Sequence, residues 1–229
     1  MVHPRVLSFD LDDTLWPVGP VIAAAESELF AWLRERCPRA VRDHDVETMR
    51  ALRATVAAQF PERVHDLTFL RRHALGIQLR EAGYEDMHAE AAFEVFAAAR
   101  NRVSFYPDVH PALERLRRRH RLFALSNGNA DLGRCGIAHF FDGHVTARGA
   151  GAAKPDARIF AALAARAGVD PGNVVHIGDD PLADVVGATD AGMQAVWINR
   201  DARRWPDEWP PPARIITSLD ELAAGDVEC

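Results

Sequence analysis

The spacing of hydrophobic residues divides the chain into three stretches. Residues 6–9 form a short, mostly apolar run with β-branched and aromatic members, which is typical of a strand buried on both faces of a parallel sheet. Between residue 21 and residue 100 the apolar residues recur every three or four positions, as they do on one face of a helix. From residue 109 onward, helical and strand-like segments alternate.

The middle stretch predicts a small all-helical unit. Ala, Leu, Glu and Arg dominate it, and Pro38, Pro61 and Gly83 stand where helices are expected to end. No strand is needed to account for its pattern. The predicted helices cover residues 21–36, 45–59, 67–82 and 86–102.

The last stretch predicts an α/β fold with a Rossmann-like, doubly wound parallel sheet that has helices on both faces. The strand at 6–9 belongs to the same sheet, so the helical unit interrupts it. We expect a discontinuous core of residues 1–17 and 103–229 and a helical cap of residues 18–102 that selects the substrate. Predicted helices cover 109–119, 156–167 and 182–191, and predicted strands cover 122–125, 174–177, 195–198 and, at one edge, 214–216.

Composition and charge narrow the class of protein. Of the 229 residues, 48% are hydrophobic and 26% charged, and the formal net charge is -6, so the chain lacks the basic excess of nucleic-acid-binding domains. Cys37, Cys135 and Cys229 are far apart and form no metal or redox motif. With no membrane-spanning run and no apolar leader, we expect a cytoplasmic protein that binds neither nucleic acid nor membranes. The oligomeric state stays open.

Polar side chains follow three of the predicted strands, at the point where each strand ends. Open α/β sheets bind ligands at the carboxyl ends of their strands, so we expect these side chains to converge on one edge of the sheet. A lysine in front of a predicted helix is placed to join them. The residues are Asp10, Asp12, Ser126, Asn127, Asp179 and Asp180, with Lys154 as the lysine.

Each motif alone also has a plain structural explanation. The acidic loop is not a calcium-binding EF-hand, because that motif needs Gly and Glu where this chain has Leu15 and Val21. A Ser-Asn-Gly run can be an ordinary turn, and a Lys-Pro pair can simply open a helix. Together, however, the motifs crowd several carboxylates, which repel each other unless a hard cation lies between them, and Mg²⁺ fits best. With Lys154 and Ser126, such a cation would surround a phosphate group.

In this order the four motifs resemble those of the haloacid dehalogenase superfamily, over essentially the whole chain, with the helical unit in the place of a type I cap. The resemblance implies that Asp10 is a nucleophile that forms an aspartyl-phosphate. It implies that Asp12 is first the general acid and then the base that activates water. Ser126, Asn127 and Lys154 would hold the phosphoryl group.

The same resemblance implies a metal site. Asp10, the backbone carbonyl of Asp12 and Asp179 would hold Mg²⁺, and Asp180 would help directly or through water. Dehalogenases of the superfamily lack an aspartate at the place of Asp12, which favours a phosphate ester over a halide as the substrate.

Within the superfamily the chain is similar to bacterial flavin-pathway phosphatases, which act on 5-amino-6-(5-phosphoribitylamino)uracil and on FMN. The likeness is carried by residues 9–15, 126–130, 148–155, 176–180 and 192–195, and in the helical unit by the pair His65-Asp66 and nearby Arg71. It implies Mg²⁺-dependent hydrolysis of a small phosphomonoester. The alternatives are a phosphatase for nucleotides or sugar phosphates, a sugar-phosphate mutase, a response-regulator-like switch of about half this length, and a non-catalytic phosphate-binding protein.

Four residues are candidates for contact with the rest of the substrate: Trp16, His65, Arg71 and Arg72. For the two arginines the alternative is a solvated helix face, and for His65 it is a structural hydrogen bond. The pair His65-Asp66 does not indicate a metal site of its own, because no second histidine pair has matching spacing.

Overall fold

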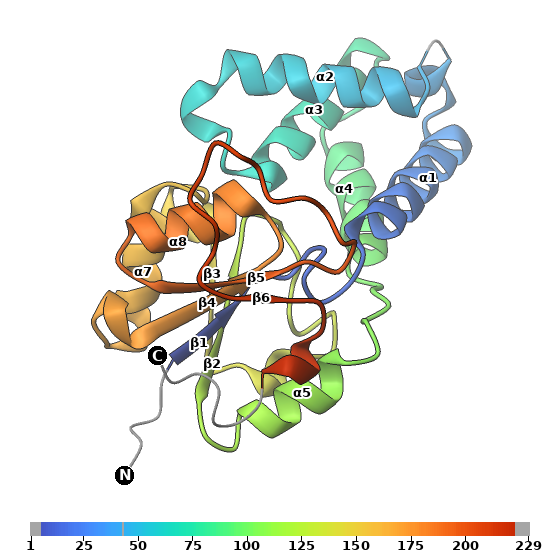
Figure 1. Ribbon diagram of the computed structural model, residues 1–229. Coiled ribbons are helices and arrows are strands. Elements are labelled where there is room, and N and C mark those ends of the chain that lie inside the picture. Colours follow the sequence, from blue (N-terminus) through green and yellow to red (C-terminus); the bar gives the residue numbers. More distant parts are fainter. Residues whose placement is uncertain (1–5, 43, 223–229) are drawn as a thin grey trace. The chain divides into compact units, whose positions relative to one another are not determined.

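The computed structural model describes residues 6–42 and 44–222. Its central element is a six-stranded sheet in the order β3-β2-β1-β4-β5-β6, and all neighbouring strands are parallel. Figure 1 shows helices on both faces of the sheet, so the expected Rossmann-like α/β fold is confirmed. The strands are β1 (Val6–Phe9), β2 (Arg121–Ser126), β3 (Gly143–Thr146), β4 (Val174–Gly178), β5 (Gln194–Ile198) and β6 (Ile215–Ile216).

Apart from α6, which the sequence pattern does not predict, the helices follow the expected order along the chain. They are α1 (Val18–Arg36), α2 (Val46–Gln59), α3 (Leu67–Glu81), α4 (Met87–Arg100), α5 (Val109–Leu116), α6 (Ala147–Ala150), α7 (Ala157–Ala167) and α8 (Gly187–Asp190). A π-helical turn, Pro181–Val186, directly precedes α8. Short 3-10 turns cover Pro38–Val41, Pro61–Arg63, Ala138–Phe140, Pro171–Asn173 and Leu219–Glu221.

The strand β1 lies in the middle of the sheet, where all four of its residues are buried. It pairs with β2 on one side and β4 on the other, and Phe9 at its end is level with Ala124 and Ile177. The carboxyl ends of these three strands therefore lie side by side. The loops that follow them share one edge of the sheet, as the sequence predicts.

Apolar residues at helical spacing hold the helices against the sheet. In α7, Ile159, Phe160 and Leu163 form one buried cluster with Val6 and Phe123 of the sheet. Complete burial of a side chain of this size contributes about 1.5–3 kcal/mol, so a cluster of this kind fixes the position of α7. The helix α5 likewise buries four apolar residues on one face.

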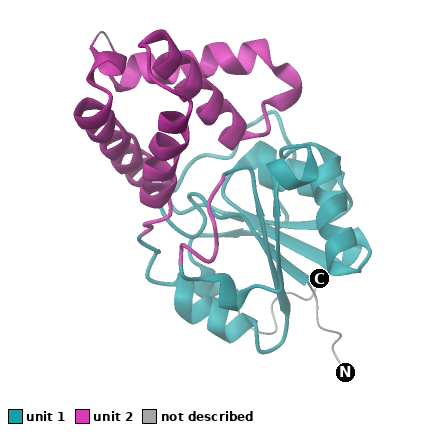
Figure 2. Cartoon of the chain, turned by 180° about the vertical axis from the view of Figure 1, so that it is seen from behind, with its two compact units in different colours: residues 1–17, 104–128, 136–229 teal, residues 18–103, 129–135 magenta. Residues whose placement is uncertain are grey.

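The chain forms two compact units (Figure 2). Residues 1–17, 104–128 and 136–229 form the unit that contains the sheet, and residues 18–103 and 129–135 form the second unit, which contains α1 to α4. In the second unit, Asp45 and Thr48 form a capping box at the start of α2, and Asp66 accepts a hydrogen bond from the backbone of Phe69 at the start of α3. The core of this unit includes Leu29, Leu33, Leu75, Leu79, Phe93 and Phe96.

In the sheet unit, the segment before the helical insertion is bonded to the segment that follows it. The backbone N–H of Tyr106 donates to the carbonyl of Leu15 at 3.0 Å. The indole of Trp16 packs edge to face on Phe105, with 5.5 Å between ring centroids. Trp16 is fully buried, so the expectation that it contacts the substrate is replaced by a role in packing.

Three local expectations differ from the structure. The sequence pattern does not predict the strand β3, because its residues, Gly-His-Val-Thr, include only one aliphatic side chain. The strand lies at a sheet edge, where most of its residues are half-buried. The single helix expected at 182–191 is divided into the π-helical turn and α8. The helix α7 begins at Ala157 after its N-cap Asp156, so Pro155 precedes this helix and does not open it.

Cys37 and Cys135 are buried thiols that form no disulfide within the described residues, and Cys229 lies outside those residues. Within residues 6–42 and 44–222, none of the helices combines the length and the apolar character needed to cross a membrane.

Candidate active site

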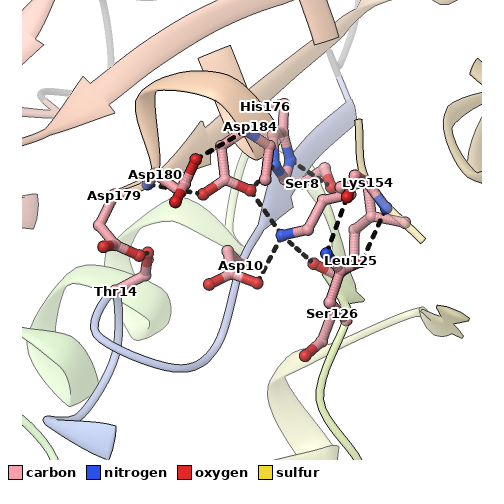
Figure 3. Close-up of polar contacts among 12 residues, drawn as sticks. Ser8, Asp10, Thr14, Leu125, Ser126, Lys154, His176, Asp179, Asp180 and Asp184 are labelled. Carbon is pink, nitrogen blue, oxygen red and sulfur yellow. Dashed lines mark hydrogen bonds and ion pairs between the residues drawn. The ribbon is translucent and has the colours of Figure 1, made fainter. Parts of the chain in front are cut away.

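Polar residues gather where β1, β2 and β4 end, and Figure 3 shows how they lie. Asp10 directly follows β1, and its backbone N–H donates to the carbonyl of Ile177 in β4 at 2.9 Å. Ser126 is the last residue of β2, and Asp179 directly follows β4. The order of the strands thus brings together side chains that are up to 169 positions apart in the sequence.

The ammonium group of Lys154 lies at the centre of this cluster (Figure 3). Its Nζ atom is 2.6 Å from Oδ1 of Asp10, 2.5 Å from Oδ1 of Asp184 and 3.1 Å from the carbonyl oxygen of Leu125. Burial lowers the pKa of Lys154, but the two carboxylates outweigh it and raise the pKa above its usual value. Lys154 is therefore a fixed positive charge next to Asp10.

Asp184 connects this lysine to the sheet, and the sequence gives it no separate role. Its Oδ1 atom is also 3.0 Å from Nε2 of His176, and its Oδ2 atom accepts the backbone N–H of Asp180 at 2.9 Å. Nδ1 of His176 lies 3.0 Å from the hydroxyl of Ser8. Burial opposes the ionisation of Asp184, but Lys154 and then His176 hold its pKa well below the usual range. Its place after Gly-Asp-Asp, one turn downstream, is the signal that could have identified it.

Asp10, Asp179 and Asp184 form a cluster of carboxylates, with one oxygen from each within 4.8 Å of the others. Burial raises the pKa of Asp10 well above its usual range, although Lys154 opposes this rise. Burial, together with the nearby carboxylates of Asp184 and Asp13, raises the pKa of Asp179 to about 7. Burial is the main cause of both shifts, and the neighbouring carboxylates add to it. Oxygen ligands in this number suit a hard divalent cation.

Asp12 lies in the turn that follows β1, beside the carboxylate cluster in sequence but not part of it. One of its carboxylate oxygens accepts the indole N–H of Trp16 at 2.9 Å. The turn is closed by the backbone N–H of Asp13, which donates to the carbonyl of Trp16 at 2.7 Å, and Asp13 has a positive φ of 58°. The Asp12 side chain is thus held by an indole that is itself fully buried.

The loop after β2 fixes the backbone of Lys154. The side-chain oxygen of Asn127 accepts the Lys154 backbone N–H at 2.7 Å, and its amide donates to the Lys154 carbonyl at 3.0 Å. The hydroxyl oxygen of Ser126 accepts the backbone N–H of Gly128 at 2.9 Å. Because the Asn127 side chain is engaged in this way, its backbone is the part available to a bound anion.

Three further candidates from the sequence, Asp180, Arg71 and Arg72, make contacts outside the cluster around Lys154. Asp180 is the N-cap of the π-helical turn, since its Oδ1 atom accepts the backbone N–H groups of Leu182 and Ala183. In the helical unit, Arg72 is exposed and forms an ion pair with Glu90, which fits the solvated helix face considered for it. Arg71 is buried instead, so a solvated face is the wrong description of this residue.

Comparisons with known proteins agree on one family. A family model described as a haloacid dehalogenase-like hydrolase matches residues 4–192. The 5-amino-6-(5-phospho-D-ribitylamino)uracil phosphatase YigB of Escherichia coli is 34% identical to this chain, and the match covers 93% of this chain and 90% of that protein. A phosphoserine phosphatase of Thermus thermophilus is 31% identical, and the match covers 92% of this chain and 95% of that protein.

Solved structures give the same fold. A 2-haloacid dehalogenase from Pseudomonas syringae superposes with a TM-score of 0.90 and 37% identity, and the match covers 96% of each chain. A haloacid-dehalogenase-type phosphatase from Thermococcus onnurineus superposes with a TM-score of 0.68 and 26% identity, over 95% of each chain.

Proposed function

This chain belongs to the haloacid dehalogenase-like hydrolases and is a phosphatase, and we propose that it hydrolyses small phosphomonoesters through an aspartyl-phosphate on Asp10, with Mg²⁺ as cofactor. The observation that carries the proposal is the position of Lys154. Its ammonium group lies 2.6 Å from Asp10, at the edge of the sheet where Asp179 and Ser126 also lie. A carboxylate nucleophile beside a fixed positive charge is what transfer of a phosphoryl group to an aspartate requires.

In the first step, a carboxylate oxygen of Asp10 attacks phosphorus and the bond to the leaving oxygen breaks. Lys154 balances negative charge on the transferred group, and the hydroxyl of Ser126 with the loop at Asn127 holds the phosphoryl oxygens. Asp12 gives its proton to the leaving alkoxide, which cannot leave easily as an anion. Trp16 donates to Asp12 at 2.9 Å and so fixes the direction of that carboxyl group.

In the second step, water attacks the aspartyl-phosphate. The Asp12 carboxylate accepts a proton from this water, the P–O bond to Asp10 breaks, and inorganic phosphate leaves. Asp10 returns as a carboxylate and Asp12 as an acid, so both residues are restored. Splitting hydrolysis into two displacements replaces one difficult step with two easier ones.

The donor set fits a magnesium ion. Asp10 and Asp179 offer carboxylate oxygens that lie within 4.8 Å of each other, and the backbone carbonyl of Asp12 would complete the protein ligands. The oxygens of Asp184 already accept hydrogen bonds from Lys154, His176 and Asp180, so Asp184 suits a supporting position. When bound, Mg²⁺ supplies positive charge that stabilises the transferring phosphoryl group.

For the substrate, we propose 5-amino-6-(5-phosphoribitylamino)uracil or FMN, selected by the helical unit. Support comes from the 34% identity with a phosphatase of that name over nearly the whole chain. The 31% identity with a phosphoserine phosphatase supports a different small phosphate ester as the alternative substrate. Nucleotides and sugar phosphates are further alternatives. The named dehalogenase structure makes haloacid hydrolysis the second candidate, since it is 37% identical.

The experiment is a panel assay that measures phosphate and chloride release in parallel. We expect Mg²⁺-dependent phosphate release from small phosphomonoesters, with the flavin precursor and FMN tested beside nucleotides, phosphoserine and sugar phosphates, and no chloride from 2-chloropropionate. A mutase would form an isomer without free phosphate. Activity that survives a chelator, or full activity in Asp10→Asn, would contradict the mechanism. Chloride release without phosphate release would establish the second candidate.

A further inference from the structure

Asp179, one of the residues proposed to bind the metal, is bonded to side chains of β5 and of the segment that follows β5. The strands β4 and β5 are neighbours, and Gly178, just before Asp179, is level with Trp197. The indole Nε1 of Trp197 donates to the backbone carbonyl of Asp179 at 2.8 Å. Nη2 of Arg203 donates to the same carbonyl at 2.6 Å. Both lone pairs of this carbonyl are therefore used by side chains from the neighbouring strand and its continuation.

Arg203 also holds one oxygen of the Asp179 side chain. Its Nη2 atom lies 3.1 Å from Oδ2 of Asp179, so a single nitrogen bonds both the backbone and the carboxylate of this residue. The other carboxylate oxygen, Oδ1, lies 3.4 Å from the hydroxyl of Thr14, which is a weak contact. Arg203 thus restrains Asp179 at two atoms and leaves Oδ1 with capacity for a further partner.

The backbone of Arg203 is itself fixed, in the way that Asn127 fixes Lys154. The side-chain oxygen of Asn199 accepts the Arg203 backbone N–H at 2.8 Å, and its amide donates to the Arg203 carbonyl at 2.8 Å. Within this turn Ala202 has a positive φ of 53°, which is uncommon for a residue with a Cβ atom, so the turn is held in this form by its surroundings. Lys154 and Arg203 are therefore each placed by an asparagine that forms two hydrogen bonds with their backbone.

An ordinary surface ion pair does not have this support. The next residue, Arg204, shows the contrast, because it pairs with Asp207 at 2.8 Å and both side chains are exposed. Pairs of that kind contribute little to stability. Arg203 instead reaches a side chain that is 15% exposed, and its shortest bond goes to a backbone carbonyl. A surface ion pair alone does not explain an arginine that is fixed at its own backbone and directed at a largely buried residue.

We propose that Arg203 is a positioning residue for metal binding, which holds Asp179 so that a carboxylate oxygen stays available to Mg²⁺ beside Asp10. This role rests on the proposed function, in which both aspartates are ligands of the ion. Hydrogen bonds to ligating carboxylates orient them, and their loss lowers metal affinity by about 10–100-fold. The charge of Arg203 repels a cation, but its side chain is 44% exposed, so water and salt screen the repulsion. We therefore expect orientation to decide the sign of the effect.

The first test measures metal binding without turnover. Free Mn²⁺, which suits the same oxygen ligands as Mg²⁺, is measured by electron paramagnetic resonance during titration of the wild type, Arg203→Met and Arg204→Met. We expect the Kd to rise about 10–100-fold in Arg203→Met and to stay unchanged in Arg204→Met. Arg204→Met is the matched control, because it removes the same group one residue away, where the partner is Asp207. A Kd in Arg203→Met that equals the wild-type value or lies below it would overturn the proposal.

A second variant tests whether a charged donor is what Asp179 requires. One nitrogen of Arg203 makes both bonds to Asp179, so an ammonium group with three donors can replace it. Arg203→Lys should therefore bind Mn²⁺ more tightly than Arg203→Met does, and equal Kd values in the two variants would reject the proposed role. A purely structural role would lower the melting temperature of metal-free Arg203→Met and leave its Kd unchanged.

The substitution Asp10→Asn distinguishes failure of this inference from failure of the proposed function. If Asp10→Asn weakens Mn²⁺ binding and Arg203→Met does not, the metal site stands and the role of Arg203 is rejected. If the wild type binds no Mn²⁺, the metal site and the role of Arg203 are rejected together. If Mn²⁺ binding depends on both residues but no phosphomonoester is hydrolysed, the proposed function is rejected and the role of Arg203 is retained.

Discussion

The substitution Gly178→Ala tests how strictly the position of Asp184 must be kept. A Cβ atom on Gly178, the last residue of β4, would lie 2.2 Å from Cγ and 2.3 Å from Oδ2 of Asp184. An ordinary contact begins near 3.4 Å, so the Asp184 carboxylate would have to move by about 1.2 Å. Such a shift cannot preserve the bonds of Asp184 to Lys154 at 2.5 Å, to His176 at 3.0 Å and to the Asp180 backbone at 2.9 Å.

The size of the effect follows from these contacts. Overpacking of a filled interior costs about 1–3 kcal/mol, and separating the partners of a buried ion pair costs about 3–5 kcal/mol. Because Asp184 is 1% exposed and relaxation recovers part of the loss, we expect the free energy of unfolding to fall by about 3 kcal/mol. Lys154 would lose one of its two anchoring carboxylates, and a displacement of about 1 Å at a reacting group lowers kcat by about 100-fold.

Urea unfolding followed by fluorescence and steady-state phosphate release measure the two quantities. Gly172→Ala is the matched control. It lies just before the same strand, and a Cβ atom there has its nearest neighbour at 4.0 Å, so we expect a change within about 0.5 kcal/mol and unchanged kcat. If Gly178→Ala keeps wild-type stability and turnover, the Asp184 carboxylate does not need its observed place and the reasoning is refuted.

Three further predictions concern the candidate active site. Lys154→Met leaves the carboxylates of Asp10 and Asp184 without their cation, so kcat should fall by about 100-fold or more in a phosphate-release assay, and near-normal turnover would exclude Lys154 from the site. Asp12→Asn should slow alkyl phosphates by about 10²–10⁴-fold but p-nitrophenyl phosphate far less, because nitrophenolate hardly needs a proton; equal losses would remove Asp12 from the acid role. Because the pKa of Asp179 is raised to about 7, a proton competes with the metal below that pH, so the Mg²⁺ concentration for half-maximal activity should fall as the pH rises from 6 to 8. A pH-independent requirement would show that Asp179 is not a ligand.

The sequence is informative where a pattern has a single physical solution. The run at 6–9 must be buried on both faces, and the polar residues at strand ends must share an edge once the strands are parallel. This is why the fold could be predicted, and why Lys154 and Asp10, which are 144 positions apart, were expected together. The edge strand β3 has no such constraint, because its pattern is shared by many loops.

Side-chain contacts that depend on tertiary packing could not be predicted. Asp184 reaches Lys154 because the π-helical turn after β4 directs it back toward the sheet, and the chain before it reads as an ordinary helix start. The sequence neighbours of Arg71, Arg72 and His73, are polar and suggest an exposed helix face. Arg71 is nevertheless buried, because it pairs with Glu26 and packs on the ring of Phe96. In both cases the decisive partner comes from another element of the structure.

The bonded segments on either side of the helical insertion have a consequence for how this protein can diversify. The hydrogen bond from Tyr106 to Leu15 and the edge-to-face contact of Trp16 with Phe105 join the two points of the sheet unit where the chain leaves for the helical insertion and returns from it. A module of different length or origin could be exchanged between these points without shifting the register of β1. Under the proposed function, substrate selection by the helical unit and phosphoryl transfer in the sheet unit can therefore change independently of each other.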